Sequence, residues 1–134
     1  MQQRHINPPG VYAPPPGMYT HVVAVGRTLY VSGLLPYDEE GKPVGGEDVE
    51  AQYEQAWRNL TLALGAAGAT VSDLVRTTTY IVGQRHVAAV RDVRRRIVPK
   101  PPPASTLIVV AGLADPACLV EVDAIAVIGS GRSS

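Results

Sequence analysis

Apolar residues along the chain repeat with two different periods, and these predict a domain built from both strands and helices. Alternating or β-branched apolar runs predict strands at residues 21–25, 28–34, 74–82, 106–110 and 119–128. Apolar residues spaced three and four apart predict helices over residues 48–64 and 84–98. The predicted order is β-β-α-β-α-β-β, an α/β (α+β) domain with a mixed sheet.

Glycine and proline mark the turns and the ends of this domain. Gly26 and Arg27 separate the first two strands, and a glycine at the first of two central positions predicts a type II′ hairpin turn. Residues 1–17 are rich in proline and predict an extended arm. Residues 129–134 predict a flexible tail. With 134 residues, we expect a single domain over 1–134.

The last predicted strand is apolar on both of its faces. One face carries Val120, Val122, Ala124, Ala126 and Ile128, and the other carries Leu119, Glu121, Asp123, Ile125 and Val127. Two helices cover one face of such a sheet, so the second apolar face needs another cover. We therefore expect an obligate homo-oligomer, with Glu121 on the face that meets the other subunit.

Composition narrows the class of function. The chain has 12 basic and 12 acidic residues, so it lacks the basic excess expected of a protein that binds nucleic acid or a membrane surface. No apolar stretch is long enough to span a bilayer. The single cysteine, Cys118, starts an apolar run, which favours a buried inert thiol and a reducing compartment, and hence the cytoplasm.

The sequence gives no sign of a metal or organic cofactor. His5, His21 and His86 are dispersed without ligand spacing, and His21 is interpreted as structural. No glycine-rich phosphate loop or nucleophile elbow is present. We expect neither a metal site nor a cofactor.

Several ordered motifs carry a resemblance to a known family. They are Tyr19, "YVSGLLP" (30–36), "QAWRNLTLALGAAGATVSDLVRTTTYIV" (55–82), "PAST" (103–106) and "LVEVDAIAV" (119–127). Over nearly its whole length the chain resembles the RidA/YjgF family, also named endoribonuclease L-PSP-like. The resemblance implies a chorismate-mutase-like fold with a mixed six-stranded sheet and two helices on one face. It also implies a homotrimer with small-molecule clefts between subunits.

The resemblance also implies an activity and a set of site residues. Active members hydrolyse enamines or imines such as 2-aminoacrylate to keto acids and ammonia. By resemblance, Tyr19 and the Ser32-Gly33 pair line the cleft, and Glu121 positions or activates water, with Asp123 a second acidic position. In these members an arginine in a P-A-R-S motif holds the substrate carboxylate.

This chain departs from the family pattern at the arginine. Ser105 occupies that position and Thr106 the next, while Leu34 replaces a glutamine and Arg91 an asparagine. A guanidinium grips a carboxylate through two charge-assisted hydrogen bonds of roughly 1.5–3 kcal/mol each. Replacing it with a hydroxyl forfeits about two to four decades of affinity. Ser105 therefore argues against the usual 2-iminobutanoate/2-iminopropanoate deaminase activity.

Alternatives remain open at this stage. One alternative is that Arg91 supplies the missing positive charge; the other is that it belongs to a solvated helix face with Arg94, Arg95 and Arg96. If no arginine replaces the missing one, the substrate lacks a carboxylate and is a neutral or larger molecule. Glu121 is either a general base or an interface carboxylate. The chain is either a divergent hydrolase or deaminase, with Ser105, Tyr19 and Gly33 orienting the substrate, or a non-catalytic protein that binds or senses a metabolite. Zero net charge argues against a nuclease.

Overall fold

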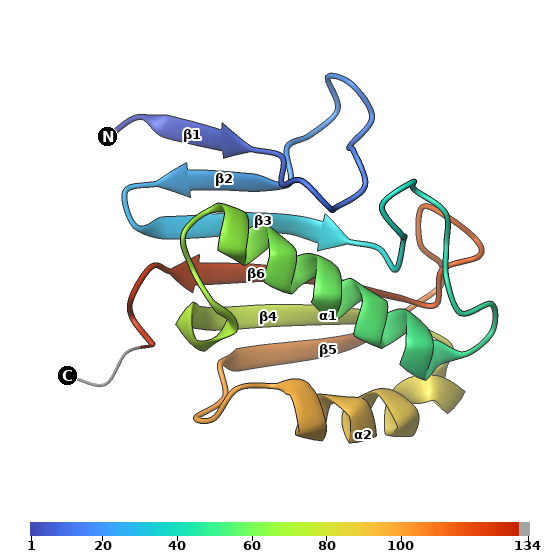
Figure 1. Ribbon diagram of the computed structural model, residues 1–134. Helices are drawn as coiled ribbons and strands as arrows, with labels where there is room; N and C mark the ends of the chain where they lie inside the picture. The colour runs from blue at the N-terminus through green and yellow to red at the C-terminus, as the bar shows by residue number, and fades with distance from the viewer. Residues whose placement is uncertain (132–134) are drawn as a thin grey trace.

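A computed structural model describes residues 1–131 of the chain, and its centre is a six-stranded sheet of order β1-β2-β3-β6-β4-β5 (Figure 1). The strands are β1 (Gln3–Ile6), β2 (Val22–Val25), β3 (Thr28–Leu34), β4 (Leu74–Val82), β5 (Ala104–Val110) and β6 (Val120–Val127). Only β4 and β5 pair in parallel, and the other neighbours are antiparallel. The predicted mixed sheet is confirmed.

The two predicted helices are also present. They are α1 (Val49–Ala66) and α2 (Val87–Ile97), and short 3₁₀ turns, η1 (Val71–Asp73) and η2 (Gln84–His86), precede β4 and α2. Asp48 caps α1, because its side chain accepts hydrogen bonds from the backbone N–H groups of Glu50 and Ala51. No helix within residues 1–131 is both long enough and apolar enough to cross a membrane.

Strand β1 was not among the strands predicted from apolar patterns. It lies inside the proline-rich arm and reads QRHI, with three exposed residues, yet it pairs antiparallel with β2 from Gln3↔Val25 to Ile6↔Val22. An edge strand of this kind depends on backbone hydrogen bonds and not on buried side chains, so apolar alternation does not reveal it. It completes the six strands that the resemblance implied.

Several boundaries of the prediction also change. Helix α2 begins at Val87 and not at residue 84, because Gln84–His86 form the 3₁₀ turn η2. Strand β5 begins at Ala104, two residues before the predicted start, because pairing with β4 already begins at Arg76↔Ala104. In the predicted tail, residues 129–131 form a turn, and the Gly131 N–H donates a hydrogen bond to Asp73 Oδ1 at 2.9 Å. Residues 132–134 lie outside the described part. The hairpin turn is confirmed: Gly26 has a φ of 59°, and no non-glycine residue within 1–131 has a positive φ.

The core lies between the helices and one face of the sheet. Val120, Val122, Ala124 and Ala126 on β6 are at most 3% exposed, as the alternation predicted. Helix α1 crosses this face in Figure 1. Helix α2 reaches the same face, since Arg94 contacts the buried Thr77 hydroxyl at 3.4 Å. No helix of residues 1–131 lies over the opposite face (Figure 1).

Two buried amides hold α1 to the loops at one end of the sheet. Gln52 Nε2 donates to the carbonyls of Gly46 and Ala117, both at 2.9 Å, and Gln52 Oε1 accepts from Leu119 N–H at 2.7 Å. Further along the helix, Asn59 Nδ2 donates to the carbonyls of Leu35 and Tyr37, at 3.1 and 3.0 Å. These bonds fix the segments that follow β3 and precede β6.

Replacing Gln52 with methionine keeps the side-chain volume but removes the partner of three partly buried backbone groups, the carbonyls of Gly46 and Ala117 and the N–H of Leu119. We expect the Gln52→Met variant to lose about 1–3 kcal/mol of unfolding free energy, measured by urea denaturation. Arg58→Met on the exposed side of α1 is the control and should change this energy by less than about 0.5 kcal/mol. An equally small loss for Gln52→Met would contradict the stabilising role of the Gln52 hydrogen bonds.

Candidate functional site

The candidate site lies where β3 and β6 fall out of register. Pairing runs regularly to Val31↔Ala124 and resumes at Leu34↔Val122, so Ser32 and Gly33 form an irregular, bulged step. A Cβ built on Gly33 would overlap Oε1 of Glu121. The carboxylate of Glu121 therefore lies directly on the Gly33 backbone, which explains why a glycine stands in this strand.

Glu121 is the unpaired acid of this region. It is partly buried and makes no hydrogen bond or ion pair with any residue that the structure describes. Burial raises the pKa of Glu121, and the charge of Asp123 raises it further. Asp123, two residues along on the same face, differs because it accepts a hydrogen bond from the Tyr80 hydroxyl at 2.7 Å. A desolvated and unpaired carboxylate is a competent proton acceptor.

Tyr19 reaches the site from the end of the arm. The residue is 40% exposed, and its ring forms a T-shaped pair with the His21 ring, with ring centroids 5.7 Å apart. Burial and the charge of Glu121 both raise the pKa of Tyr19, which keeps its hydroxyl protonated and able to donate. The side chain is therefore available to orient a bound molecule.

His21 anchors the arm beneath Tyr19 and is structural, as predicted. It is fully buried, and its Nε2 donates to the Tyr12 carbonyl at 2.6 Å, while its backbone N–H donates to Asn7 Oδ1 at 3.0 Å. Burial lowers the pKa of His21, so the ring is neutral at pH 7. Tyr12 in turn accepts Leu35 N–H at 2.9 Å, which ties the arm to the end of β3.

The Ser32 side chain has a more limited role than the family resemblance implies. Its hydroxyl donates to the Thr20 carbonyl at 2.6 Å and so holds the residue next to Tyr19. With its proton committed, the Ser32 oxygen can accept but not donate a further hydrogen bond. This contact positions the end of the arm.

These groups line a shallow hollow of about 220 Å³. Its walls are Tyr19, Ser32, Gly33, Leu35, Ala114 and Glu121. Leu35 and Ala114 were not predicted as site residues: Leu35 is an unremarkable apolar residue after β3, and Ala114 belongs to a turn-rich loop. Asp115 shapes that loop, since it accepts hydrogen bonds from Tyr37 Oη and Ala117 N–H, both at 2.8 Å.

The remaining predicted site residues lie elsewhere in the same chain. Ser105 pairs with Thr77, whose side chain is buried under the helices, so Ser105 is an exposed residue on the helix side of the edge strand. Thr106 pairs with Thr78 on the face of Glu121, two strands away from β6, and accepts a hydrogen bond from Arg76 at 2.8 Å. Arg91 is exposed on α2.

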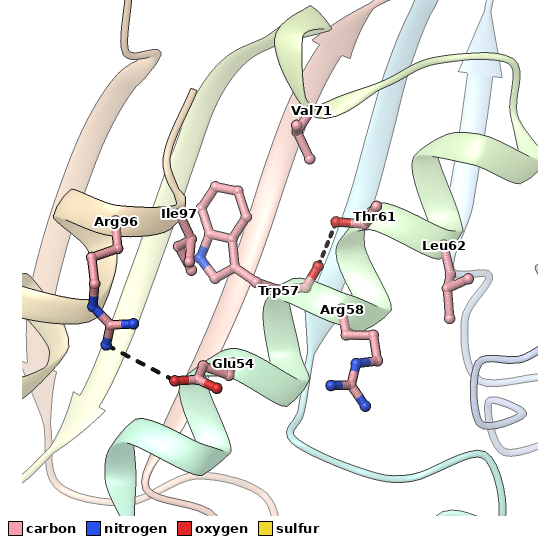
Figure 2. Close-up of a pocket in the computed structure, with 8 residues that line it drawn as sticks. All are labelled: Glu54, Trp57, Arg58, Thr61, Leu62, Val71, Arg96 and Ile97. Carbon is pink, nitrogen blue, oxygen red and sulfur yellow. Dashed lines mark hydrogen bonds and ion pairs between the residues drawn. The ribbon is translucent and has the colours of Figure 1, made fainter. Parts of the chain in front are cut away.

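A second hollow, of about 470 Å³, lies on the helix side of the molecule (Figure 2). Trp57, Thr61 and Leu62 of α1 form one wall, and Ile97 and Arg96 of α2 form another. Its acid, Glu54, is exposed and lies 4.0 Å from Arg96. The Thr61 hydroxyl donates to the Trp57 carbonyl. This hollow lacks the desolvated, unpaired acid of the first.

The described residues contain no cluster of three or more histidines, cysteines or acids that could hold a metal ion. Cys118 is 1% exposed, and burial raises the pKa of its thiol to about 11. The thiol is thus protonated at pH 7 and inert, as predicted.

The arrangement defines an α+β domain of the YjgF type, with an acid-bearing hollow on its uncovered sheet face. The family model for Endoribonuclease L-PSP matches residues 11–128, and the chain belongs to this family, the RidA/YjgF family that its motifs resemble.

Similar proteins agree with this assignment. The RutC family protein UK114 of Drosophila melanogaster is 36% identical over 119 residues, which cover 88% of this chain and 85% of the relative. The 2-iminobutanoate/2-iminopropanoate deaminase of Dermatophagoides farinae is 32% identical over 117 residues, 87% of this chain and 91% of the relative. The crystal structure of RidA from the Antarctic bacterium Psychrobacter sp. PAMC 21119 superposes with a TM-score of 0.85 at 30% identity, over 93% of this chain and 99% of that one.

The contact between Gly33 and Glu121 can be tested by a double-mutant cycle. Gly33→Ala places a methyl group against the carboxylate and should lower the unfolding free energy by about 1–3 kcal/mol. In a Glu121→Ala background the same change should cost less, with a coupling of at least about 0.5 kcal/mol. Gly65→Ala, in α1 with open space around it, is the control and should stabilise by about 0.4–1 kcal/mol. Equal costs of Gly33→Ala in both backgrounds would contradict the contact.

The raised pKa of Glu121 predicts a pH-dependent stability difference. An acid whose pKa is higher in the folded state favours folding when protonated, and this contribution disappears as the pH rises through the folded pKa. Glu121→Gln should therefore be more stable than the wild type at pH 7 and lose this advantage near pH 4, as measured by urea denaturation. If the stability difference between Glu121→Gln and the wild type is the same at pH 7 and pH 4, the raised pKa of Glu121 is contradicted.

Proposed function

We propose that this chain forms a homotrimer and that Glu121, in a cleft between subunits, activates water to hydrolyse a small enamine, imine or related carbonyl compound. The observation that carries the proposal is the state of Glu121: partly buried, unpaired among the described residues, and open to the 220 Å³ hollow. Membership of the family, and a relative named as an imine deaminase, support the reaction class.

The uncovered face of the sheet supports the assembly. Tyr30 is 50% exposed and Ile108 41% exposed, and their register partners Ile125 and Tyr80 lie on the same face. Apolar side chains of this size gain by packing against another subunit. The motif residues Ser105 and Thr106 lie on the edge strand, far from the hollow of their own chain. A neighbouring copy would bring them to it.

The residues around the hollow have distinct roles in the proposed reaction. Glu121 accepts a proton from water as the water oxygen attacks the carbon of the C=N bond. Tyr19 donates a hydrogen bond that orients the bound molecule, and Leu35 and Ala114 contact its apolar part. Gly33 allows the carboxylate to sit against β3, and Ser32 keeps the arm in place. No cofactor or metal enters this scheme.

A second candidate is a binding or sensing protein without catalysis. Ser105 favours it, since the residue that grips a carboxylate in active family members is absent from its position. The same absence argues against the 2-iminobutanoate/2-iminopropanoate deaminase activity for which the Dermatophagoides farinae relative is named. Zero net charge and a single cysteine support the further proposals of no nucleic-acid or membrane partner and of a cytoplasmic location.

Substitution of Glu121 tests the catalytic proposal. Glu121→Gln should reduce hydrolysis of an accepted imine or enamine by about 10²–10⁴-fold, because general-base catalysis is lost. Its trimer should remain intact by light scattering. Glu54→Gln, on the exposed side of α1, is the control and should retain full activity.

Two outcomes would contradict particular parts of the proposal. Unchanged turnover in Glu121→Gln would remove the catalytic role, and a monomeric wild type would remove the shared cleft. If no imine, enamine or carbonyl compound yields product but a ligand raises the melting temperature, the binding protein is the correct candidate.

A further inference from the structure

We infer that the cleft selects a positively charged imine that carries no carboxylate group. This inference rests on the proposed function, since it concerns the same hollow and the same acid. It reverses the charge preference of a site that grips a carboxylate, and it follows from the charges that face the hollow within residues 1–131.

The hollow is acidic in the described part of the chain. Among residues 1–131, Glu121 is the only charged residue that lines it, and Asp123 lies two positions away on the same face. His21, behind Tyr19, is neutral because burial lowers its pKa. An unpaired carboxylate in a partly desolvated position favours a cationic guest over an anionic one.

Within residues 1–131, no lysine or arginine lines the hollow. Arg76 shares the open face but pairs with Ile125, about 13 Å along β6 from Glu121, and its guanidinium contacts the Thr106 hydroxyl. Arg91 is on the outer side of α2. A neighbouring subunit that presents Ser105 to the cleft adds a hydroxyl at the position where active family members have the arginine.

The other residues that line the hollow suit a ligand with an apolar part and a cationic group. Leu35 and Ala114 offer apolar contact, and the aromatic ring of Tyr19, a residue that is 40% exposed, can attract a cation at close range. The hollow of about 220 Å³ has room for a branched alkyl group of a few carbons.

The chemistry of a protonated imine fits the same acid. Water adds to the carbon of R₂C=NHR′⁺, the C=N electron pair moves to nitrogen, and Glu121 accepts the proton that water loses. Glu121 returns this proton to nitrogen, the C–N bond breaks, and the hydroxyl proton leaves with the amine. The products are R₂C=O and R′NH₃⁺, so charge and atoms balance. The carboxylate stabilises the cation when it binds and then serves as the base.

A matched pair of amine and acid tests binding without turnover. 3-Methylbutylammonium should raise the melting temperature of the wild type, and 3-methylbutanoate at the same concentration and ionic strength should not. The expected difference in affinity is about 10- to 100-fold, the worth of one charge-assisted hydrogen bond. Glu121→Gln should abolish the effect of the ammonium ion. Equal or stronger stabilisation by the carboxylate would overturn the inference.

A matched pair of imines tests selectivity in the reaction. An amine oxidase converts 3-methylbutylamine to an imine, and an amino-acid oxidase converts leucine to the imine that differs from it only by the carboxylate. With semicarbazide as the competing trap, the wild type should hydrolyse the carboxylate-free imine at least tenfold faster, and Ser105→Arg should invert this preference. Arg91→Ala should leave the preference unchanged.

The binding experiment and the imine experiment together separate the inference from the proposed function. If the wild type prefers the leucine-derived imine, or Arg91→Ala removes an existing preference for it, the inference is wrong and the proposed hydrolysis stands. If neither the wild type nor Ser105→Arg hydrolyses either imine, this hydrolysis is wrong, and the binding pair alone decides whether the site prefers a cation.

Discussion

A six-stranded sheet with helices over only one face is the constraint from which the rest of this structure follows. Val120, Val122, Ala124 and Ala126 are buried beneath α1, so β6 cannot shift its register by one residue without exposing them. The alternate residues, Glu121 and Asp123 among them, are thereby fixed on the uncovered face. The acid of the candidate site and the surface proposed for assembly share that face because one strand alternates.

The candidate site is assembled from contacts that hold backbone segments in place. Glu121 can lie against β3 only because Gly33 has no side chain, and the bulge at Ser32-Gly33 interrupts the pairing at that point. The arm is held by His21, and the segment after it, which carries Tyr19, is held by the Ser32 hydroxyl. On the other side, buried amides of α1 fix the segments that follow β3 and precede β6. The hollow thus depends on a scaffold with little freedom, while Glu121 itself keeps its hydrogen-bonding capacity for a ligand.

Much of this could be predicted from the sequence, and the failures have physical reasons. The strands and helices with apolar faces were predictable because burial imposes a period, and the two faces of β6 were predicted residue by residue. Strand β1 was not, because its polar residues are held by backbone pairing. Family motifs identified Glu121 and Gly33, but not Leu35 or Ala114, whose place in the hollow depends on loop geometry. Nor could sequence alone reveal that the Ser32 hydroxyl is committed to Thr20, or that Ser105 lies on the helix side of an edge strand.

The difference between Gly33 and Ser105 shows which features of the site can vary. Gly33 is enclosed by β6, and any side chain there meets Glu121, so the fold itself restricts that position. Ser105 is exposed at the edge of the sheet, where neither the core nor a hydrogen bond of its side chain within the described chain depends on it. A change of residue at 105 therefore has little cost to folding. In the proposed function, the position of the base is fixed by the architecture, whereas the residue proposed to set the charge of the cleft is not. The same scaffold would then keep its chemistry while the class of molecule it accepts changes.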